Sequence, residues 1–425
     1  MSTLTIGIIV VFVLGYAFIA MESLTKINKA AIALLMFVFC WVLYMVDPAP
    51  FVQLMHPDFK GTGEQVLSFV NSLITEHLGD TATTLFFLMG AMTIVEIVDQ
   101  NGGFNWVKNV MHSKTKRSLL WKIAFMTFFL SAILDNLTTS IVMIMILRKL
   151  VHDKKDRMIY ASLVIIAANS GGAFSPIGDV TTIMLWNAGM ITAGGVISEI
   201  FIPSLLSMII PALLLQTALK GNIEYDDMGT DLMGDTVVLE FTAQQRKVIF
   251  AIGVGGLCFV PLFHYLTELP PFVGILLVLG ILWTVTELFY RHMHRRRGDN
   301  IQFSKRVSNL LSRIDMSTIL FFLGILMAVA CLEEVGVLHE LGGGLNSFFE
   351  GNHYAVTGII GVLSSIVDNV PLVAGSMGMY PVQATGDMAV DGIFWQLLAY
   401  CAGVGGSILI IGSAAGVVVM GLEKI

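Results

Sequence analysis

The stretch Ser131-Ala132-Ile133-Leu134-Asp135-Asn136 recurs in the second half of the chain as Ser364-Ser365-Ile366-Val367-Asp368-Asn369. Two more motifs recur at nearly the same offset. The Leu-Phe-Phe-Leu of residues 85–88 returns at 320–323, and the Gly-Gly of residues 171–172 returns at 405–406. Because the three motifs keep their order, we infer an internal duplication.

These motifs lie in a very apolar chain. Of its 425 residues, 56% are hydrophobic and only 13% are charged, and the mean hydropathy is +0.80. A soluble domain carries about 25% charged residues. The composition therefore excludes a soluble enzyme, a secreted disulfide scaffold, a disordered chain and a nucleic-acid-binding protein, and it makes membrane lipid the surrounding partner.

Apolar runs of about 20 residues have the length that crosses a bilayer. A shorter segment, 65–78, has its apolar side chains on one face and predicts a helix in the membrane interface. The predicted simple spans are 4–21, 28–46, 82–100, 196–219, 246–264, 271–290 and 317–335.

The lysines and arginines predict the orientation of these spans. All of them except Lys60 fall on the cytoplasmic side under two conditions. The N-terminus must face the periplasm, and residues 119–150 must form a re-entrant hairpin that enters and leaves from the cytoplasm. A straight crossing there would put the basic residues of 148–157 on the wrong side, against the positive-inside rule.

The predicted fold is an all-α polytopic membrane protein with two inverted repeats. Each repeat has a plan of five spans that includes a broken helix, together with a re-entrant hairpin, and the odd number of spans inverts the second copy. The counterpart of span 196–219 would lie beyond Ile425, so either the protein lacks this last span or the sequence is a truncated product. The first repeat covers 1–220 (hairpin 119–150, broken helix 157–188), a cytoplasmic linker covers 221–245, and the second repeat covers 246–425 (hairpin 355–380, broken helix 392–422).

Three aspartates lie where a charge is most expensive. Asp135, Asp179 and Asp368 are deep in apolar sequence, where insertion of an aspartate costs about 2.5–3.5 kcal/mol. The glycine pairs are expected to break their helices and free backbone carbonyls, which is tolerated only inside protein or beside a wet cavity. Two hairpin tips and two helix breaks should therefore meet near the midplane, and their oxygen atoms suit an alkali cation.

The candidate residues fall into two groups by role. Those expected to bind ions or protons are Asp135, Asn136, Thr138, Thr139, Asp179, Ser365, Asp368, Asn369 and Ser407. Those expected to supply helix-break backbone are Gly171, Gly172, Gly405 and Gly406.

Each candidate also fits a structural role. Asp135 and Asp368 fit the N-caps of short helices. The sequence from Pro176 to Asp179 fits an ordinary turn followed by a helix start. The hydroxyl groups, Ser413 among them, fit hydrogen bonds between membrane helices, and the glycine pairs fit close helix packing.

Four segments together resemble the NhaD-type sodium/proton antiporters of the ion transporter superfamily. They are Asp135-Asn136-Leu137-Thr138-Thr139, the stretch from Asn169 to Asp179, the stretch from Ser364 to Pro371, and Gly405-Gly406-Ser407. The resemblance covers nearly the whole chain. It implies a homodimer in the bacterial inner membrane, each protomer having a scaffold domain and a moving transport domain, with no cofactor besides the transported Na⁺ and H⁺. Dicarboxylate carriers of the superfamily have serine where both tips here have aspartate, which favours the antiporter branch.

The resemblance implies exchange of cytoplasmic Na⁺ or Li⁺ for external H⁺. A buried carboxylate is neutralised by a cation or by a proton, and so can carry each in turn. We expect Asp135 and Asp368 to exchange protons for one Na⁺ that Asn136 and Asn369 also bind. Asp179 is a third candidate carrier.

Three alternatives stay open at this point. The first is Na⁺-coupled symport of a small anion of the dicarboxylate or arsenite type, which is disfavoured because no basic residue is expected at either tip. The second is an intramembrane aspartyl protease, but its Gly-x-Gly-Asp motif is broken by Pro176, so we do not expect an enzyme. The third is a channel, and inverted repeats with broken helices favour alternating access instead.

Overall fold

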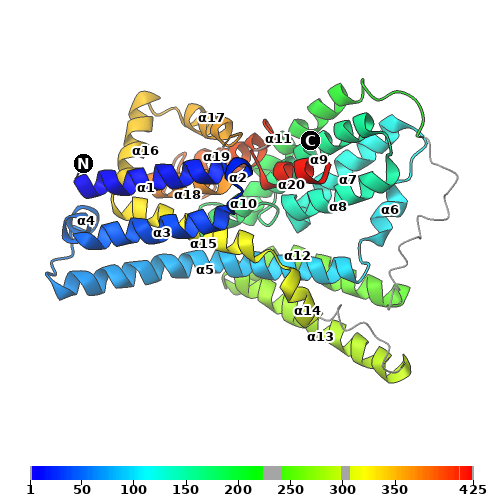
Figure 1. Ribbon diagram of the computed structural model, residues 1–425, viewed down its shortest axis with the longest axis horizontal. Helices are drawn as coiled ribbons and strands as arrows, with labels where there is room; N and C mark the ends of the chain where they lie inside the picture. Colours follow the sequence, from blue (N-terminus) through cyan, green and yellow to red (C-terminus); the bar gives the residue numbers. More distant parts are fainter. Residues whose placement is uncertain (1, 224–240, 298–306, 367, 411, 424–425) are drawn as a thin grey trace.

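The structure, a computed structural model, describes residues 2–223, 241–297, 307–366, 368–410 and 412–423. Within these ranges the regular elements are helices, and there is no β-strand, so the predicted all-α fold is confirmed (Figure 1). The helices of the first half are α1 (Thr3–Ala20), α2 (Glu22–Thr25), α3 (Lys29–Val46), α4 (Ala49–Met55), α5 (Glu64–Gln100), α6 (Asn105–Met111), α7 (Lys116–Leu134), α8 (Asn136–Leu150), α9 (Lys154–Ala173), α10 (Val180–Asn187) and α11 (Ala193–Leu215). Those of the second half are α12 (Ala243–Thr267), α13 (Pro271–Arg297), α14 (Val307–Leu310), the 3₁₀ helix η3 (Leu311–Arg313), α15 (Met316–Glu334), α16 (Val337–Phe348), α17 (His353–Leu363), α18 (Asn369–Met379), α19 (Ile393–Gly405) and α20 (Ala414–Glu423).

Eight of the described helices are long and apolar enough to cross a membrane, which confirms a multi-pass membrane protein. They are α1, α3, α5, α7, α11, α12, α13 and α15. All but α7 coincide with a predicted simple span. The linker predicted at 221–245 falls largely on residues 224–240, which lie outside the described residues.

The separate interface helix predicted at residues 65–78 is wrong. These residues form the first half of α5, a continuous helix of 37 residues that is about 55 Å long at 1.5 Å per residue. No proline lies within residues 64–100 to interrupt this helix. The apolar face at the start of α5 packs on protein: the Phe69 ring stacks on Phe59 with their centroids 4.3 Å apart.

Short polar side chains fix where several helices begin. The Asn28 carboxamide oxygen accepts a hydrogen bond from the Ala30 amide at 2.8 Å at the start of α3, and Asp153 caps α9 in the same way. Thr242 and Gln245 form a reciprocal capping box at the start of α12. Each cap satisfies amides that have no partner within the helix.

The segment from 116 to 150 turns back on itself at Asp135, where α7 ends and α8 begins. The start of α7 lies beside the start of α9, because the Lys116 ammonium is 2.5 Å from the Asp156 carboxylate. Only residues 151–153 separate the end of α8 from α9. Both ends of this segment therefore lie at one end of α9.

The segment from 353 to 379, formed by α17 and α18, has a corresponding arrangement with α19. His353 Nδ1 lies 3.1 Å from Asp387 Oδ2, and the Asp387 carbonyl accepts a hydrogen bond from the Phe394 amide in the first turn of α19. The start of α17 thus lies beside the start of α19.

An equivalent serine hydrogen bond joins the first hairpin to α9 and the second hairpin to α19. The Ser131 hydroxyl donates to the Ala168 carbonyl at 2.6 Å, and the Ser364 hydroxyl donates to the Ala402 carbonyl at 2.7 Å. Both serines begin the repeated six-residue motif. The two copies of the motif therefore make equivalent contacts.

The two interrupted helices, α9–α10 and α19–α20, run in opposite directions. At one end, the Thr192 amide and hydroxyl donate to the Asp391 carboxylate at 2.7 and 2.6 Å. At the other end, the Arg157 guanidinium lies 2.7 Å from the Glu423 carboxylate. Because α10 and the start of α19 share one end, whereas α9 and the end of α20 share the other, the helices are antiparallel, and their interruptions lie side by side.

Two glycines let the hairpin arms approach these helices. A Cβ atom at Gly171 would lie 2.1 Å from the Phe128 carbonyl oxygen, and one at Gly405 would lie 2.1 Å from the Gly361 carbonyl oxygen. No side chain fits at that distance. The turns at Asp135 and after Ser364 are thereby brought against the middle of the molecule.

We expect Gly405→Ala to destabilise the protein by about 1–3 kcal/mol, because the added methyl group overpacks a backbone contact. The melting temperature of the purified protein should fall. Gly358→Ala is the matched control: Gly358 is exposed on α17 and a Cβ there meets nothing within 4 Å. Equal melting temperatures for the two variants would contradict the close approach.

Candidate functional site

Asp179 lies at the centre of the polar groups where the two interrupted helices cross. The helix α9 ends at Ala173, and α10 begins after Asp179, whose carboxylate accepts a hydrogen bond from the Thr181 amide at 3.3 Å. Pro176 lacks an amide hydrogen and cannot continue the helix through this stretch. Asp179 is only 2% exposed, so its carboxylate depends on protein groups for its contacts.

The tip of each hairpin supplies an amide to this carboxylate. Asn136, the first residue of α8, places Nδ2 3.4 Å from Asp179 Oδ2. Asn369, the first residue of α18, places Nδ2 3.2 Å from Oδ2 and 3.4 Å from Oδ1. The structure therefore brings together three of the predicted residues from three separate parts of the chain.

Asn169 connects Asp179's neighbours to the second interrupted helix. Its Oδ1 accepts a hydrogen bond from Asn136 Nδ2 at 3.1 Å, and its Nδ2 donates to the hydroxyls of Ser407 at 2.9 Å and Ser413 at 3.0 Å. Sequence reasoning placed Asn169 in the helix interruption but not among the ligands. The sequence does contain a signal for this role, namely a polar amide in an apolar helix. In the structure Asn169 is fully buried, and a buried amide needs hydrogen-bond partners.

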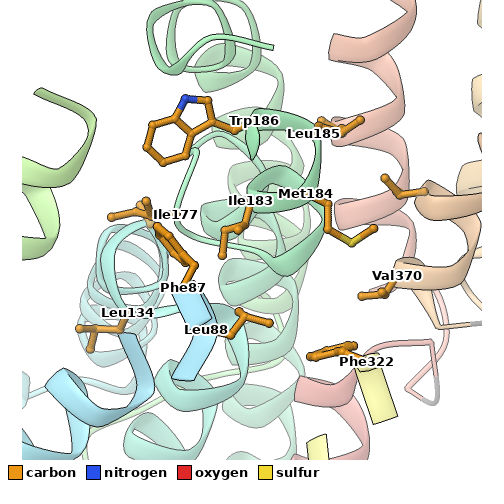
Figure 2. Close-up of a cluster of buried hydrophobic side chains, with 14 of the residues drawn as sticks. Phe87, Leu88, Leu134, Ile177, Ile183, Met184, Leu185, Trp186, Phe322 and Val370 are labelled. Carbon is orange, nitrogen blue, oxygen red and sulfur yellow. The ribbon is translucent and has the colours of Figure 1, made fainter. Parts of the chain in front are cut away.

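A cluster of buried apolar side chains includes residues on both sides of Asp179 in the chain (Figure 2). They come from α5, the end of α7, the stretch before Asp179, α10, α15 and α18. In such surroundings electrostatic interactions are stronger than in water. The labelled members of the cluster are Phe87, Leu88, Leu134, Ile177, Ile183, Met184, Leu185, Trp186, Phe322 and Val370.

Asp135 and Asp368 each cap the short helix that follows. Asp135 accepts hydrogen bonds from the Thr138 amide at 2.7 Å and the Thr138 hydroxyl at 2.9 Å. Its backbone has φ 90° and ψ 160°, a region that costs non-glycine residues about 1–3 kcal/mol. Asp368 accepts from the Val370 amide at 3.3 Å. The capping role predicted as an alternative is present at both tips, next to the asparagines that contact Asp179.

The expectation that no basic residue lies at either tip is wrong for the second tip. Lys29 Nζ, from the start of α3, is 3.3 Å from Asp368 Oδ2. Sequence patterns do not predict this pair, because the two residues lie in different halves of the chain. In this structure the charge of Lys29 is matched by Asp368.

The remaining candidates lie around the centre with different contacts. The Ser365 hydroxyl donates to the Val362 carbonyl at 2.6 Å within its own turn. The hydroxyls of Thr139 and Ser170 are buried and have no hydrogen-bond partner among the described residues. Buried polar atoms of this kind need an explanation, such as a ligand or water.

The first glycine pair lies just before its interruption, and the second pair lies where its interruption starts. Gly171 and Gly172 are in the last turn of α9, and Gly405 is the last residue of α19, followed by Gly406 at its C-cap. They allow close packing, as Gly171 and Gly405 show, while the backbone leaves the helix after them.

The oxygen atoms of this centre suit a hard monovalent cation. The groups that could bind a cation here are a carboxylate, amides and hydroxyls. Their oxygen atoms favour ions such as Na⁺ over soft metals. Among the described residues no group of three or more His, Cys, Asp or Glu side chains is placed to hold a metal ion. A single buried negative charge with neutral oxygens around it can be neutralised by one such cation or by one proton.

Comparisons with known proteins agree with a membrane transporter. The family model described as Citrate transporter (CitMHS) matches residues 6–405. Sodium/proton antiporter 1 of Arabidopsis thaliana is 42% identical over 420 residues, which are 99% of this chain and 68% of that protein. Sodium/proton antiporter 2 of the same plant is 40% identical over 97% of this chain and 91% of that protein. The Na⁺/H⁺ antiporter NhaD of Alkalimonas amylolytica is 29% identical over 98% and 84%, respectively.

We expect Na⁺ to raise the melting temperature of the purified protein, and Asp179→Asn to abolish that rise. A ligand that binds only the folded state stabilises it, and loss of the carboxylate removes the charge that attracts the cation. The control is Asp58→Asn, at an exposed aspartate. The site would be refuted if Asp179→Asn and Asp58→Asn responded equally to Na⁺.

Proposed function

The chain belongs to the citrate transporter family CitMHS of the ion transporter superfamily, and from its similarity to sodium/proton antiporters we propose that it exchanges cytoplasmic Na⁺ for external H⁺. The family and the antiporter relatives make it a membrane transporter. We further propose the bacterial inner membrane as its location, a periplasmic N-terminus and a homodimer as the working form.

The observation that carries this proposal is the contact of Asp179 with one amide from each hairpin tip. Asn136 and Asn369 direct Nδ2 at the carboxylate at 3.4 and 3.2 Å. A side-chain amide has a donor at one end and an acceptor at the other. Rotation of each amide would present oxygen to a bound cation, and the opposite rotation would present N–H groups to the bare carboxylate.

Exchange follows if the site holds one neutralising ion at a time. Na⁺ binds to Asp179 and the turned amide oxygens on one side of the membrane. After the site opens to the other side, a proton binds to the carboxylate and displaces Na⁺. The protonated site then opens to the first side again, where the proton is released. We propose that Asp135 and Asp368, next in the chain to the two asparagines, carry protons or help to bind the cation in the same cycle.

The exchange itself is tested in everted membrane vesicles that are acidified inside. We expect added Na⁺ or Li⁺ to release the internal protons, with K⁺ as the comparison cation, and we expect Asp179→Asn to reduce that release to the background of vesicles without the protein. Asp58→Asn should behave as wild type. Full exchange by Asp179→Asn would contradict the proposed site.

Substitution with asparagine distinguishes a role of the tip aspartates in ion or proton binding from their role as helix caps. Asparagine caps helices about as well as aspartate, so Asp135→Asn and Asp368→Asn should leave folding intact. We expect each to lower the rate of Na⁺-driven proton release at least about tenfold if its charge takes part, because neutralising it removes a cation and proton ligand. Unchanged exchange by both variants would limit the two aspartates to capping.

We propose that two protons enter for each Na⁺ that leaves. One net charge then crosses the membrane, and a potential of 100 mV contributes about 2.3 kcal/mol to the exchange. The rate of exchange in vesicles should therefore change when the potential is set by a K⁺ gradient with an ionophore. A rate that is insensitive to the potential would indicate one proton per Na⁺.

The family description names citrate, so Na⁺-coupled uptake of a small anion is the second candidate function. Against it stand the aspartates at both tips and the pairing of Lys29 with Asp368. Uptake of labelled citrate driven by a Na⁺ gradient, without proton release, would favour this candidate over exchange.

A further inference from the structure

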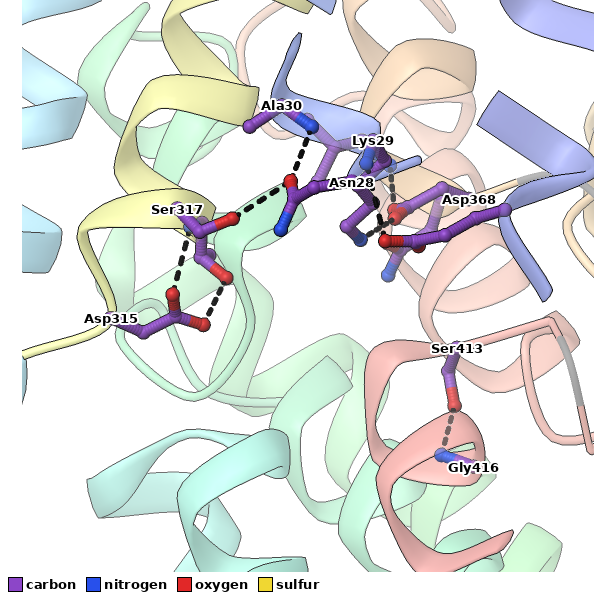
Figure 3. A network of polar contacts seen from close by, with 12 residues as sticks. Asn28, Lys29, Ala30, Asp315, Ser317, Asp368, Ser413 and Gly416 are labelled. Atoms are coloured by element: carbon purple, nitrogen blue, oxygen red, sulfur yellow. Dashed lines mark hydrogen bonds and ion pairs between the residues drawn. The ribbon is translucent and has the colours of Figure 1, made fainter. Parts of the chain in front are cut away.

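The tip of the second hairpin is held by a cation that belongs to a different part of the structure. Lys29 Nζ lies 3.3 Å from Asp368 Oδ2 (Figure 3). It also lies 4.2 Å from the centre of the Phe321 ring. Lys29 is in the first turn of α3, whereas Asp368 precedes α18. The next residue, Asn369, contacts Asp179, so this ammonium lies one residue away from the proposed ion site.

The backbone that carries Lys29 is fixed. Asn28 caps α3 and accepts a hydrogen bond from the Ser317 hydroxyl of α15 at 2.9 Å (Figure 3). The Lys29 amide itself donates to the Glu22 carboxylate at 3.1 Å. The base of the side chain is therefore anchored, while its four-carbon stem leaves the ammonium free to move.

The ion pair is accessible. The Lys29 side chain is 25% exposed and that of Asp368 is 19% exposed, so neither charge is enclosed. A partly exposed pair of this kind contributes less to stability than a fully buried one.

The first hairpin tip lacks such a partner. Asp135 accepts both of its side-chain hydrogen bonds from Thr138, in the following turn, and makes no ion pair with any described residue. The two tips are thus equivalent in sequence but differ in charge balance. Only the carboxylate of the second tip is neutralised by a side chain from α3.

We propose that the Lys29 ammonium competes with the transported alkali cation at Asp368. With no Na⁺ bound, Lys29 neutralises the carboxylate; when Na⁺ binds beside Asn369, Lys29 swings away. One carboxylate balances one monovalent cation, so Na⁺ and the Lys29 ammonium compete for the same negative charge at Asp368. This inference rests on the proposed function in one respect, since it requires an alkali cation at this site.

The competition predicts how substitutions at residue 29 shift the affinity for Na⁺. Lys29→Gln removes the competitor and should lower the half-saturating Na⁺ concentration, by about threefold or more. Lys29→Arg replaces it with a planar group that can bind a carboxylate through two hydrogen bonds, and should raise that concentration by a similar factor. A lysine that only held the hairpin in place would give no such opposite shifts.

The experiment measures the melting temperature of the purified full-length protein against NaCl, with choline chloride keeping the ionic strength constant. The matched control is Lys26→Gln, at an exposed lysine that follows α2 three positions earlier, which should leave the half-saturating concentration at the wild-type value. Lys29→Arg retains the charge, so it keeps the test decisive if Lys29→Gln folds poorly.

The outcomes separate this inference from the proposed function. Equal half-saturating concentrations in all proteins, shifts of Lys29→Gln and Lys29→Arg in one direction, or no response to Na⁺ would overturn the competition. The expected order of affinities without proton release in vesicles would support the competition and overturn Na⁺/H⁺ exchange. Proton release with no shift at residue 29 would overturn the competition alone.

Discussion

An isolated carboxylate is expensive to bury in an apolar interior unless donors or a cation face it. At Asp179, which is 2% exposed, the donors are the amides of Asn136 and Asn369. These amides reach the carboxylate only because both hairpins turn beside the interruptions of α9–α10 and α19–α20. The turns, the interruptions and the glycine contacts behind them are therefore parts of one arrangement that keeps a negative charge inside the protein.

The two halves of the chain make this arrangement with matching contacts but different charges. Ser131 and Ser364 donate to equivalent carbonyls, and the two asparagines contact the same carboxylate. The carboxylate itself comes from the first half alone, since Ser413 stands where a second aspartate would be expected from the repeat. One charge shared by two halves is consistent with a site that carries one cation at a time.

Hydropathy predicts the all-α fold and the spans because those depend on local sequence, and the structure confirms both. The boundary of α5 was not predictable, because the packing of Phe69 on Phe59 replaces the lipid contact that its pattern suggested. The candidate residues are recognisable in the sequence because a polar or charged side chain in an apolar stretch costs free energy. Their contact partners are not recognisable in this way. The contacts of Asn169 with Ser407, and of Lys29 with Asp368, join residues that only the folded chain brings together. The hairpins' depth in the membrane and the inversion of the repeats stay predictions.

The antiparallel helices α9–α10 and α19–α20 are tied together at both ends. Arg157 and Glu423 pair at one end, where the Glu423 side chain is fully buried, and Thr192 binds Asp391 at the other. Sliding one interrupted helix along the other would expose or separate a buried ion pair, which is strongly unfavourable. Motion that opens the centre to either side is therefore expected along the surfaces that face α5 and α15. In this motion the two interrupted helices are expected to move together as one rigid body, with the apolar side chains of Figure 2 at the sliding surface.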